Sequence, residues 1–290
     1  MRYDRSLAAG MLAVLLLTGC QSGGGSAVSG AASVSGEVGV SSSASVAVSA
    51  PASSQEAAAV SGVLEVTKTA DELVALSERG EWAWFDDAVM IGDSVTLKLK
   101  NFVAKQRQTT PDYFGGGQFL ASGSLGSANA LWEVDDKSVH PAYQGEKMKL
   151  EESIPLTGAK KIYLMLGIND IVVYGLEGAV ENYRTLLDNI LAAVPDAQLF
   201  VQSATPICEG AEVGALNNAN LEAYNQLLLA MCEEREIRFV DVASVMRDEN
   251  GYLPRDYCSD PDGMGIHLQD MACQLWLGYL MEDARLMQEQ

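Results

Sequence analysis

Ser94 and His267 are two residues whose types could together perform nucleophilic catalysis. Ser94 ends a Gly-Asp-Ser tripeptide that directly follows a short apolar run. A serine hydroxyl is a poor nucleophile at neutral pH, so it needs a base beside it. His267 is one of only two histidines, and it lies in a glycine-rich loop, residues 260–267, with Asp260 and Asp262. Because an acid is needed to hold the imidazole in the right tautomer, these residue types predict a Ser–His–Asp arrangement.

Asn169 is a candidate for stabilising the oxyanion that such a reaction produces. It lies in residues 167–170 (Gly-Ile-Asn-Asp), directly after another apolar run. Its amide N–H is a suitable donor to a developing negative charge, and so is the backbone N–H of Ser94 at the start of a predicted helix. An Asx-type turn at Asn169 and a helix cap at Ser94 would explain the same residues without catalysis.

Short apolar runs alternate with amphipathic stretches between residues 88 and 284. The runs lie at residues 88–91, 119–121, 162–166, 199–201 and 237–240. Such continuous runs are typical of strands that are covered on both faces. Apolar residues recur at helical spacing in residues 180–194, 221–231 and 275–284, and we expect their Met, Tyr and Trp side chains in the core. The alternation predicts a parallel sheet with helices on both faces and functional residues beyond the carboxyl ends of its strands.

Three of these motifs, in this order, resemble the SGNH/GDSL hydrolase family over about 200 residues from Asp87 onward. Residues 91–94 (Ile-Gly-Asp-Ser) resemble the family's first block, residues 167–170 match its third block, and the loop ending in His267 resembles its last. The resemblance implies an α/β fold: a three-layer α/β/α sandwich with a central, mostly parallel five-stranded sheet (flavodoxin-like). It also implies an acyl-enzyme on Ser94, with no cofactor and no metal.

The last block departs from the family pattern at the position of the acid. The family usually has Asp-x-x-His, which would place the acid at position 264, but that residue is Met264. We therefore expect Asp262 to complete the triad, because it is nearer to His267 than Asp260 is and a glycine-rich loop can bend back. Asp260, or a Ser–His dyad whose ring is oriented by a backbone carbonyl, remains the alternative.

The second block of the family, a glycine whose N–H helps to bind the oxyanion, has two candidates. Gly123 directly follows the second apolar run, and Gly126 better fits a loop that enters the next helix. Both stay open, and either could be a turn glycine.

Two further features are predicted to lie outside the catalytic machinery. His140 has no acidic or glycine-rich surroundings, so we interpret it as a surface or pocket-edge residue. Residues 115–117 (Gly-Gly-Gly) precede no Lys-Ser or Lys-Thr pair, so they are predicted to form a loop rather than a phosphate cradle.

The N-terminal residues indicate export. Arg2 and Arg5 precede an apolar stretch that ends in Leu-Thr-Gly-Cys, with the cysteine at position 20. The pattern resembles a bacterial lipobox, which implies a signal peptide at residues 1–19 and lipidation of Cys20. Residues 20–62 are rich in Ser, Gly and Ala and are predicted to be a flexible tether. Residues 63–290 would then be a hydrolase domain, anchored by lipid on the extracytoplasmic face of the cell membrane.

Net charge and cysteine spacing bear on nucleic acid binding, zinc binding and disulfides. A net charge of −20 argues against nucleic acid. Four cysteines follow Cys20, none of them in a Cys-x-x-Cys pair, so a zinc site is not expected and one or two disulfides stay open. Those four are Cys208, Cys232, Cys258 and Cys273.

These observations together predict an extracytoplasmic serine esterase that hydrolyses small acyl esters, with acetyl esters of carbohydrates as the first expectation. A glycan O-acyltransferase that uses the same acyl-enzyme is one alternative. A non-catalytic surface lipoprotein is the other, and the methionine at the usual position of the acid is its main support.

Overall fold

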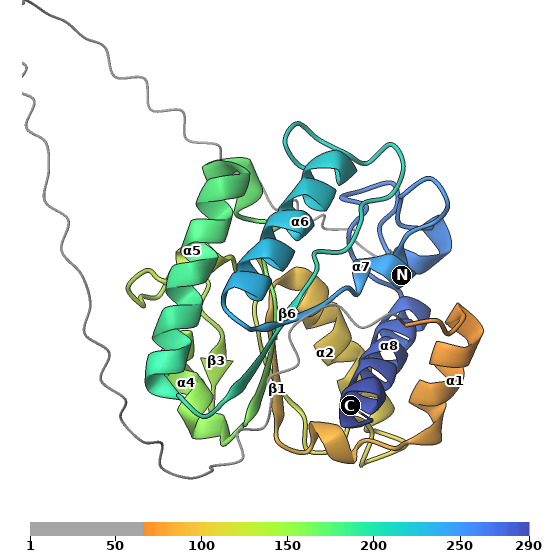
Figure 1. Ribbon diagram of the computed structural model, residues 1–290, viewed down its shortest axis with the longest axis horizontal. Helices are drawn as coiled ribbons and strands as arrows, with labels where there is room; N and C mark the ends of the chain where they lie inside the picture. The colour runs from red at the N-terminus through yellow and green to blue at the C-terminus, as the bar shows by residue number, and fades with distance from the viewer. Residues whose placement is uncertain (1–65, 290) are drawn as a thin grey trace, which may run out of the picture. The chain divides into compact units, whose positions relative to one another are not determined.

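A computed structural model describes residues 66–289 of the protein. At the centre of this part lies a five-stranded, wholly parallel sheet with the strand order β2-β1-β5-β6-β7 (Figure 1). The strands are β1 (Ala88–Gly92), β2 (Gln118–Ala121), β5 (Lys161–Met165), β6 (Gln198–Gln202) and β7 (Arg238–Val240). Each of the five predicted apolar runs overlaps one of these strands, so the predicted parallel sheet is confirmed.

Helices cover both faces of the sheet, which confirms the three-layer sandwich (Figure 1). One group packs together on one face, and it consists of α1 (Ala70–Arg79), α2 (Ser94–Gln106), α7 (Ala243–Met246) and α8 (Asp270–Gln288). The other group consists of α3 (Ser127–Ala130), α4 (Leu150–Thr157), α5 (Ile171–Ala193) and α6 (Asn218–Glu234). The short elements are η1 (Ala83–Phe85), β3 (Ala142–Tyr143), β4 (Glu146–Lys147) and η2 (Arg255–Tyr257).

Local sequence signals explain where the first two helices begin. The side chain of Thr69 accepts a hydrogen bond from the backbone N–H of Glu72, and the Glu72 carboxylate accepts from the N–H of Thr69. This reciprocal pair is a capping box, which satisfies two free donors of α1. At the start of α2 the carboxylate of Asp93 accepts from the N–H of Val95 at 2.8 Å, and so fixes the turn that carries Ser94.

Aromatic side chains fill much of the core. Tyr163 of β5 stacks on Phe200 of β6, with ring centroids 4.3 Å apart. The expectation that the helical Met, Tyr and Trp residues are core residues is confirmed, because all of these are buried: Tyr183, Tyr224, Met231, Trp276 and Tyr279. On the outer side of α8, a Cβ atom added to Gly278 would lie 1.9 Å from the carbonyl oxygen of Leu73, so α1 and α8 approach closely there.

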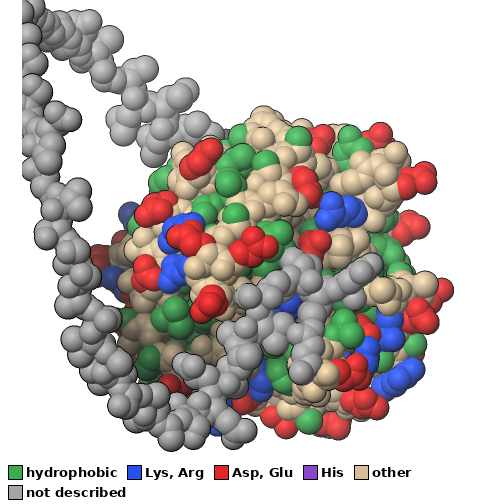
Figure 2. Space-filling model, viewed as in Figure 1, with side chains coloured by type: hydrophobic (Ala, Val, Ile, Leu, Met, Phe, Trp, Pro, Cys, Tyr) green, Lys and Arg blue, Asp and Glu red, His purple; other side chains and the backbone are tan. Residues whose placement is uncertain are grey.

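The visible surface of the described part is acidic. Acidic side chains are spread over the face that Figure 2 shows, in line with the net charge of −20. No helix within residues 66–289 is long and apolar enough to cross a bilayer. The predicted signal peptide, Cys20 and the tether lie outside the described residues, so the domain boundaries at residues 19 and 62 stay predictions.

Candidate active site

Ser94 and His267 meet at the carboxyl ends of the strands, although 173 residues separate them. The Oγ atom of Ser94 lies 2.9 Å from Nε2 of His267, a hydrogen-bond distance. Ser94 is the first residue of α2, directly after β1, and His267 lies in the loop that enters α8. Both side chains are half-buried, so the pair is held by the fold and still open to solvent. This is the geometry that a serine nucleophile and its base require.

Asp260, not Asp262, is the acid beside His267. Its Oδ2 lies 2.7 Å from Nδ1 of His267, and its Oδ1 accepts a hydrogen bond of 3.1 Å from the backbone N–H of the same residue. The expectation for Asp262 was wrong, because that exposed carboxylate pairs with Arg255 at 2.5 Å. The dyad alternative is wrong as well, since a carboxylate orients the ring.

A tight turn explains why the nearer aspartate points away. The N–H groups of Gly263 and Gly265 both donate to the carbonyl oxygen of Asp260, at 2.8 and 3.1 Å. Gly265 has a left-handed backbone with φ of 66°, which costs glycine little. The chain therefore reverses after Asp260 and returns at His267, while Asp262 and Met264 lie at the exposed tip of the turn.

Hydrogen bonds keep Asp260 ionised. Burial by itself would raise its pKa, but hydrogen bonds from His267 and from the thiol of Cys258 outweigh burial and hold the pKa of Asp260 below its usual value. An ionised carboxylate at Nδ1 fixes the tautomer that leaves Nε2 free to accept the proton of the serine.

Asn169 is joined to the nucleophile loop by hydrogen bonds. Its side-chain N–H groups donate to the carbonyl oxygen of Leu125 at 3.0 Å and to Oδ2 of Asp93 at 3.3 Å. Asp93 is the residue before Ser94, so the predicted oxyanion donor lies at the same end of the sheet as the triad. The longer of these two bonds is the weaker one, and an oxyanion that binds the amide would compete with it.

The two candidate glycines differ in their surroundings. Gly126 is buried at the start of α3, its N–H donates to Oδ1 of Asn129 at 2.8 Å, and an added Cβ atom would lie 2.7 Å from the carboxylate of Asp170. Gly123 is exposed, and within residues 66–289 its N–H makes no hydrogen bond. Which of them donates to an oxyanion stays a prediction.

His140 was interpreted as a surface or pocket-edge residue, and this was wrong. The side chain is buried, and its Nε2 lies 3.2 Å from the carbonyl oxygen of Ala130. That partner is the last residue of α3, and neither Ser94 nor Asp260 is hydrogen-bonded to His140 within residues 66–289. A Val-His-Pro sequence gives no periodic signal that would reveal this burial.

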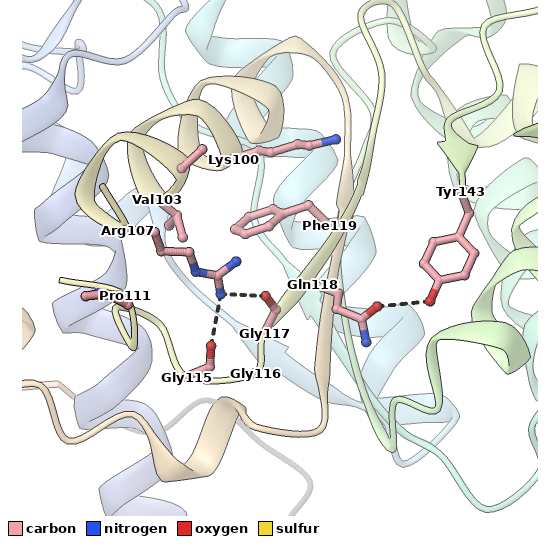
Figure 3. A pocket seen from close by; sticks show the side chains of 11 residues that line it. Lys100, Val103, Arg107, Pro111, Gly115, Gly116, Gly117, Gln118, Phe119 and Tyr143 are labelled. Carbon is pink, nitrogen blue, oxygen red and sulfur yellow. Dashed lines mark hydrogen bonds between the residues drawn. The ribbon is translucent and has the colours of Figure 1, made fainter. Parts of the chain in front are cut away.

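Gly115, Gly116 and Gly117 form a loop, as predicted. The carbonyl oxygens of Gly115 and Gly117 accept hydrogen bonds from the guanidinium of Arg107, so the loop presents acceptors to a cation (Figure 3). The loop lines a hollow of about 460 Å³ that also touches Gln118, the first residue of β2. This hollow is therefore at the opposite end of β2 from the triad.

The described part of the chain holds no group of three His, Cys, Asp or Glu residues that could bind a metal ion. Two further residues belong to the site. Asp93 links Ser94 to Asn169, and the thiol of Cys258 donates to Oδ1 of Asp260 at 3.2 Å. Asp93 lies within the Gly-Asp-Ser motif, but its contact with Asn169 joins residues that are distant in the chain. The contact of Cys258 with Asp260 depends on the turn of the loop. The sequence therefore indicates neither role.

Replacing Asp260 and Asp262 separately tests the assignment of the acid. We expect Asp260→Asn to lower kcat by up to about 10⁴-fold, because an amide at Nδ1 favours the wrong tautomer of the ring. Asp262→Asn removes only an exposed ion pair and should keep a rate close to that of the unmodified protein. Ester hydrolysis by the two variants provides the measurement, and the reverse order of rates would restore Asp262 as the acid.

Asp93 should make stability depend on pH. Burial raises the pKa of its carboxyl to about 6, whereas an unfolded aspartate titrates near pH 4, at about 3.9. Between these two pH values, Asp93 binds its proton more tightly in the folded state than in the unfolded state. The stability that a protonated Asp93 gives relative to an ionised one is therefore present below pH 4 and is lost as the pH rises through 6. Relative to Asp93→Asn, the unmodified protein should lose on the order of 2–3 kcal/mol of unfolding free energy over this range.

Urea unfolding between pH 4 and pH 8 measures this difference. Asp112→Asn, at an exposed carboxyl, is the matched control and should follow the unmodified protein. Parallel stability curves for the unmodified protein and Asp93→Asn would contradict the raised pKa.

The fold and the motifs have matches among known proteins. Residues 91–274 match the model of the GDSL-like Lipase/Acylhydrolase family. A GDSL-like lipase from Bacteroides thetaiotaomicron VPI-5482 has a similar structure, with a TM-score of 0.52, 13% identity, and coverage of 75% of this chain and 97% of that chain. A candidate acylhydrolase from Bacteroides fragilis NCTC 9343 has a TM-score of 0.51 and 15% identity, with 77% of this chain and 100% of that chain covered.

At such identities the two structures show a shared fold. No protein with a curated function matches the chain. The family model, in contrast, spans more than half of the chain, including Ser94, Asn169 and His267. The chain therefore belongs to the GDSL-like lipase/acylhydrolase family, and it is a carboxylic ester hydrolase.

Proposed function

We propose that the protein is a lipid-anchored, extracytoplasmic serine esterase that removes small acyl groups, acetyl first, from esters on larger carriers such as carbohydrates. The observation that carries the proposal is the continuous chain of hydrogen bonds from Asp260 through His267 to Ser94. The presence of an acid beside His267 also weakens the non-catalytic alternative, whose main support was the methionine at position 264.

Each residue of the triad and each oxyanion donor has a proposed role. Ser94 attacks the ester carbonyl while His267 accepts its proton and later returns it to the leaving alcohol. Asp260 stabilises the imidazolium that forms. The N–H of Ser94, the side chain of Asn169 and one glycine N–H bind the oxyanion. Water then attacks the acyl-enzyme, with His267 again as the base.

The openness of the site supports a small acyl group on a large carrier. Ser94, Asn169 and His267 are all only half-buried, so an ester that projects from a bulky polymer can reach the nucleophile. Export and lipidation of Cys20 rest on the sequence pattern of the first 20 residues. They would place the domain where wall polymers and other glycans occur.

Hydrolysis of p-nitrophenyl acetate, butyrate and octanoate by the full chain tests the function. We expect the highest kcat/KM with acetate, and Ser94→Ala should lower kcat by about 10⁴–10⁶-fold. A preference for octanoate would overturn the small-acyl proposal and keep the serine mechanism. Turnover that persists in Ser94→Ala would overturn the mechanism. Acylated glycan in the products, when a glycan acceptor is added, would instead identify an acyltransferase.

Asn169→Ala tests the oxyanion donor. Loss of one such donor costs about 10²–10³-fold in kcat, and we expect a loss in this range with little change in KM. Asn189→Ala, which removes an amide on α5 that bonds to Glu151, is the matched control and should keep the unmodified rate. A wild-type kcat for Asn169→Ala would remove this residue from the mechanism.

A further inference from the structure

Two buried thiols lie directly behind the acid of the triad. Cys258 donates a hydrogen bond from Sγ to Oδ1 of Asp260 at 3.2 Å. The thiol of Cys208 lies close enough to Cys258 for each to affect the pKa of the other. Both residues are fully buried free cysteines. The chain of contacts that ends at Ser94 therefore begins at Cys208.

The two thiols are fixed where two separate loops touch. Cys208 belongs to the loop after β6, and its N–H donates to the carbonyl oxygen of Gly265 in the turn of the histidine loop at 2.9 Å. A Cβ atom added to Gly265 would lie 3.2 Å from Cβ of Cys208. Cys258 pairs with Leu268 in an isolated β-bridge. Backbone contacts thus hold the loop of Cys208 against the histidine loop, in which the sulfur of Cys258 contacts Asp260.

We propose that Cys208 and Cys258 form a redox site, and that closing a disulfide between them lowers esterase activity through Asp260. This inference rests on the proposed function of the triad. In the reaction, one cysteine thiolate attacks a disulfide oxidant such as oxidised glutathione and releases one glutathione thiolate, which leaves a mixed disulfide. The second cysteine thiolate then attacks the protein sulfur of that mixed disulfide and releases the second glutathione thiolate. The two cysteines lose two electrons and two protons, and the oxidant is reduced to two thiols.

The link to activity is the single hydrogen atom on Sγ of Cys258. A disulfide sulfur has no hydrogen, so Oδ1 of Asp260 would keep only the bond from the N–H of His267. The carboxylate would also face sulfur lone pairs instead of a donor. A less restrained and less stabilised carboxylate orients the imidazole less well, which slows proton transfer from Ser94. Cys258 would thus be a positioning residue, because it acts on the reaction only through Asp260.

The reduced pair should resist rapid oxidation. Burial raises the pKa of Cys258 to about 12, and it also raises the pKa of Cys208. Since the thiolate is the reactive form, exchange in the folded protein should require opening of the two loops. The disulfide would form slowly in the folded state or during folding in an oxidising compartment.

The test uses the full chain with Cys20→Ser, so that the thiol at position 20 cannot react. The protein is equilibrated with oxidised glutathione or with dithiothreitol, and kcat/KM for p-nitrophenyl acetate and the intact mass are measured. Oxidation should remove about 2 Da, link the peptides of Cys208 and Cys258, and lower kcat/KM about fivefold to tenfold, the range expected for loss of one hydrogen bond of ordinary strength. Dithiothreitol should reverse all three changes.

Variants separate positioning from packing. Cys258→Ser keeps a donor and should retain most of the reduced activity, whereas Cys258→Ala should have the lower activity of the oxidised protein; neither should respond to the oxidant. Cys232→Ala and Cys273→Ala, which remove the two other buried thiols, are the matched controls and should keep the full response.

Two outcomes would overturn the inference. One is the absence of a Cys208–Cys258 link after equilibration, and the other is a link with unchanged kcat/KM. A reduced protein without Ser94-dependent turnover would instead contradict the proposed function, and the peptide map would still decide whether the disulfide forms.

Discussion

Parallel pairing of β1 with both β2 and β5 is the constraint on which the site depends. Gly92, the last residue of β1, is in register with Ala121 on one side and Met165 on the other. The three chain segments that follow these residues must therefore leave the sheet side by side. The first segment carries Ser94, the second carries Gly123 and Gly126, and the third carries Asn169. An added Cβ atom on Gly92 would lie 2.0 Å from Oγ1 of Thr96, so the approach of strand and helix at this point requires glycine.

Two buried carboxylates join these three segments by hydrogen bonds, although burying a carboxylate costs stability. Asp93 and Asp170 are both almost fully buried, and burial raises the pKa of each. Backbone N–H groups at helix starts offset part of this cost: Asp93 accepts from the first turn of α2, and Asp170 accepts from the N–H groups of Ser127 and Ala128 at 2.8 and 2.9 Å. Negative charge at a helix N-terminus is favourable. The arrangement exchanges some stability for a fixed spacing between the loops.

The sequence was sufficient to predict the sheet and three of the four central residues, and the reason is local. Ser94 and Asn169 each lie three residues after the end of an apolar run of strand length, and His267 lies three residues before the last helix. The acid could not be predicted, because the choice between Asp260 and Asp262 depends on a left-handed turn at Gly265 and on contacts with Cys208 in another loop. Asp262 is nearer to His267 along the chain, but the turn at residues 260–265 places Asp260 beside the imidazole ring. The hairpin β3–β4 and helix α4 also escaped prediction, since they are short and lack a long apolar period.

Asp260 bonds to both the ring and the backbone N–H of His267, so acid and base form one local unit that a single short loop assembles. That unit lies in the last tenth or so of the polypeptide, while the nucleophile lies in the first third. A chain that leaves the ribosome from its N-terminus therefore presents the serine long before its base. Hydrolytic competence arises only when the final segment docks through α8 onto α1 and α2. The order of the residues along the chain thus makes the triad depend on the docking of its last segment.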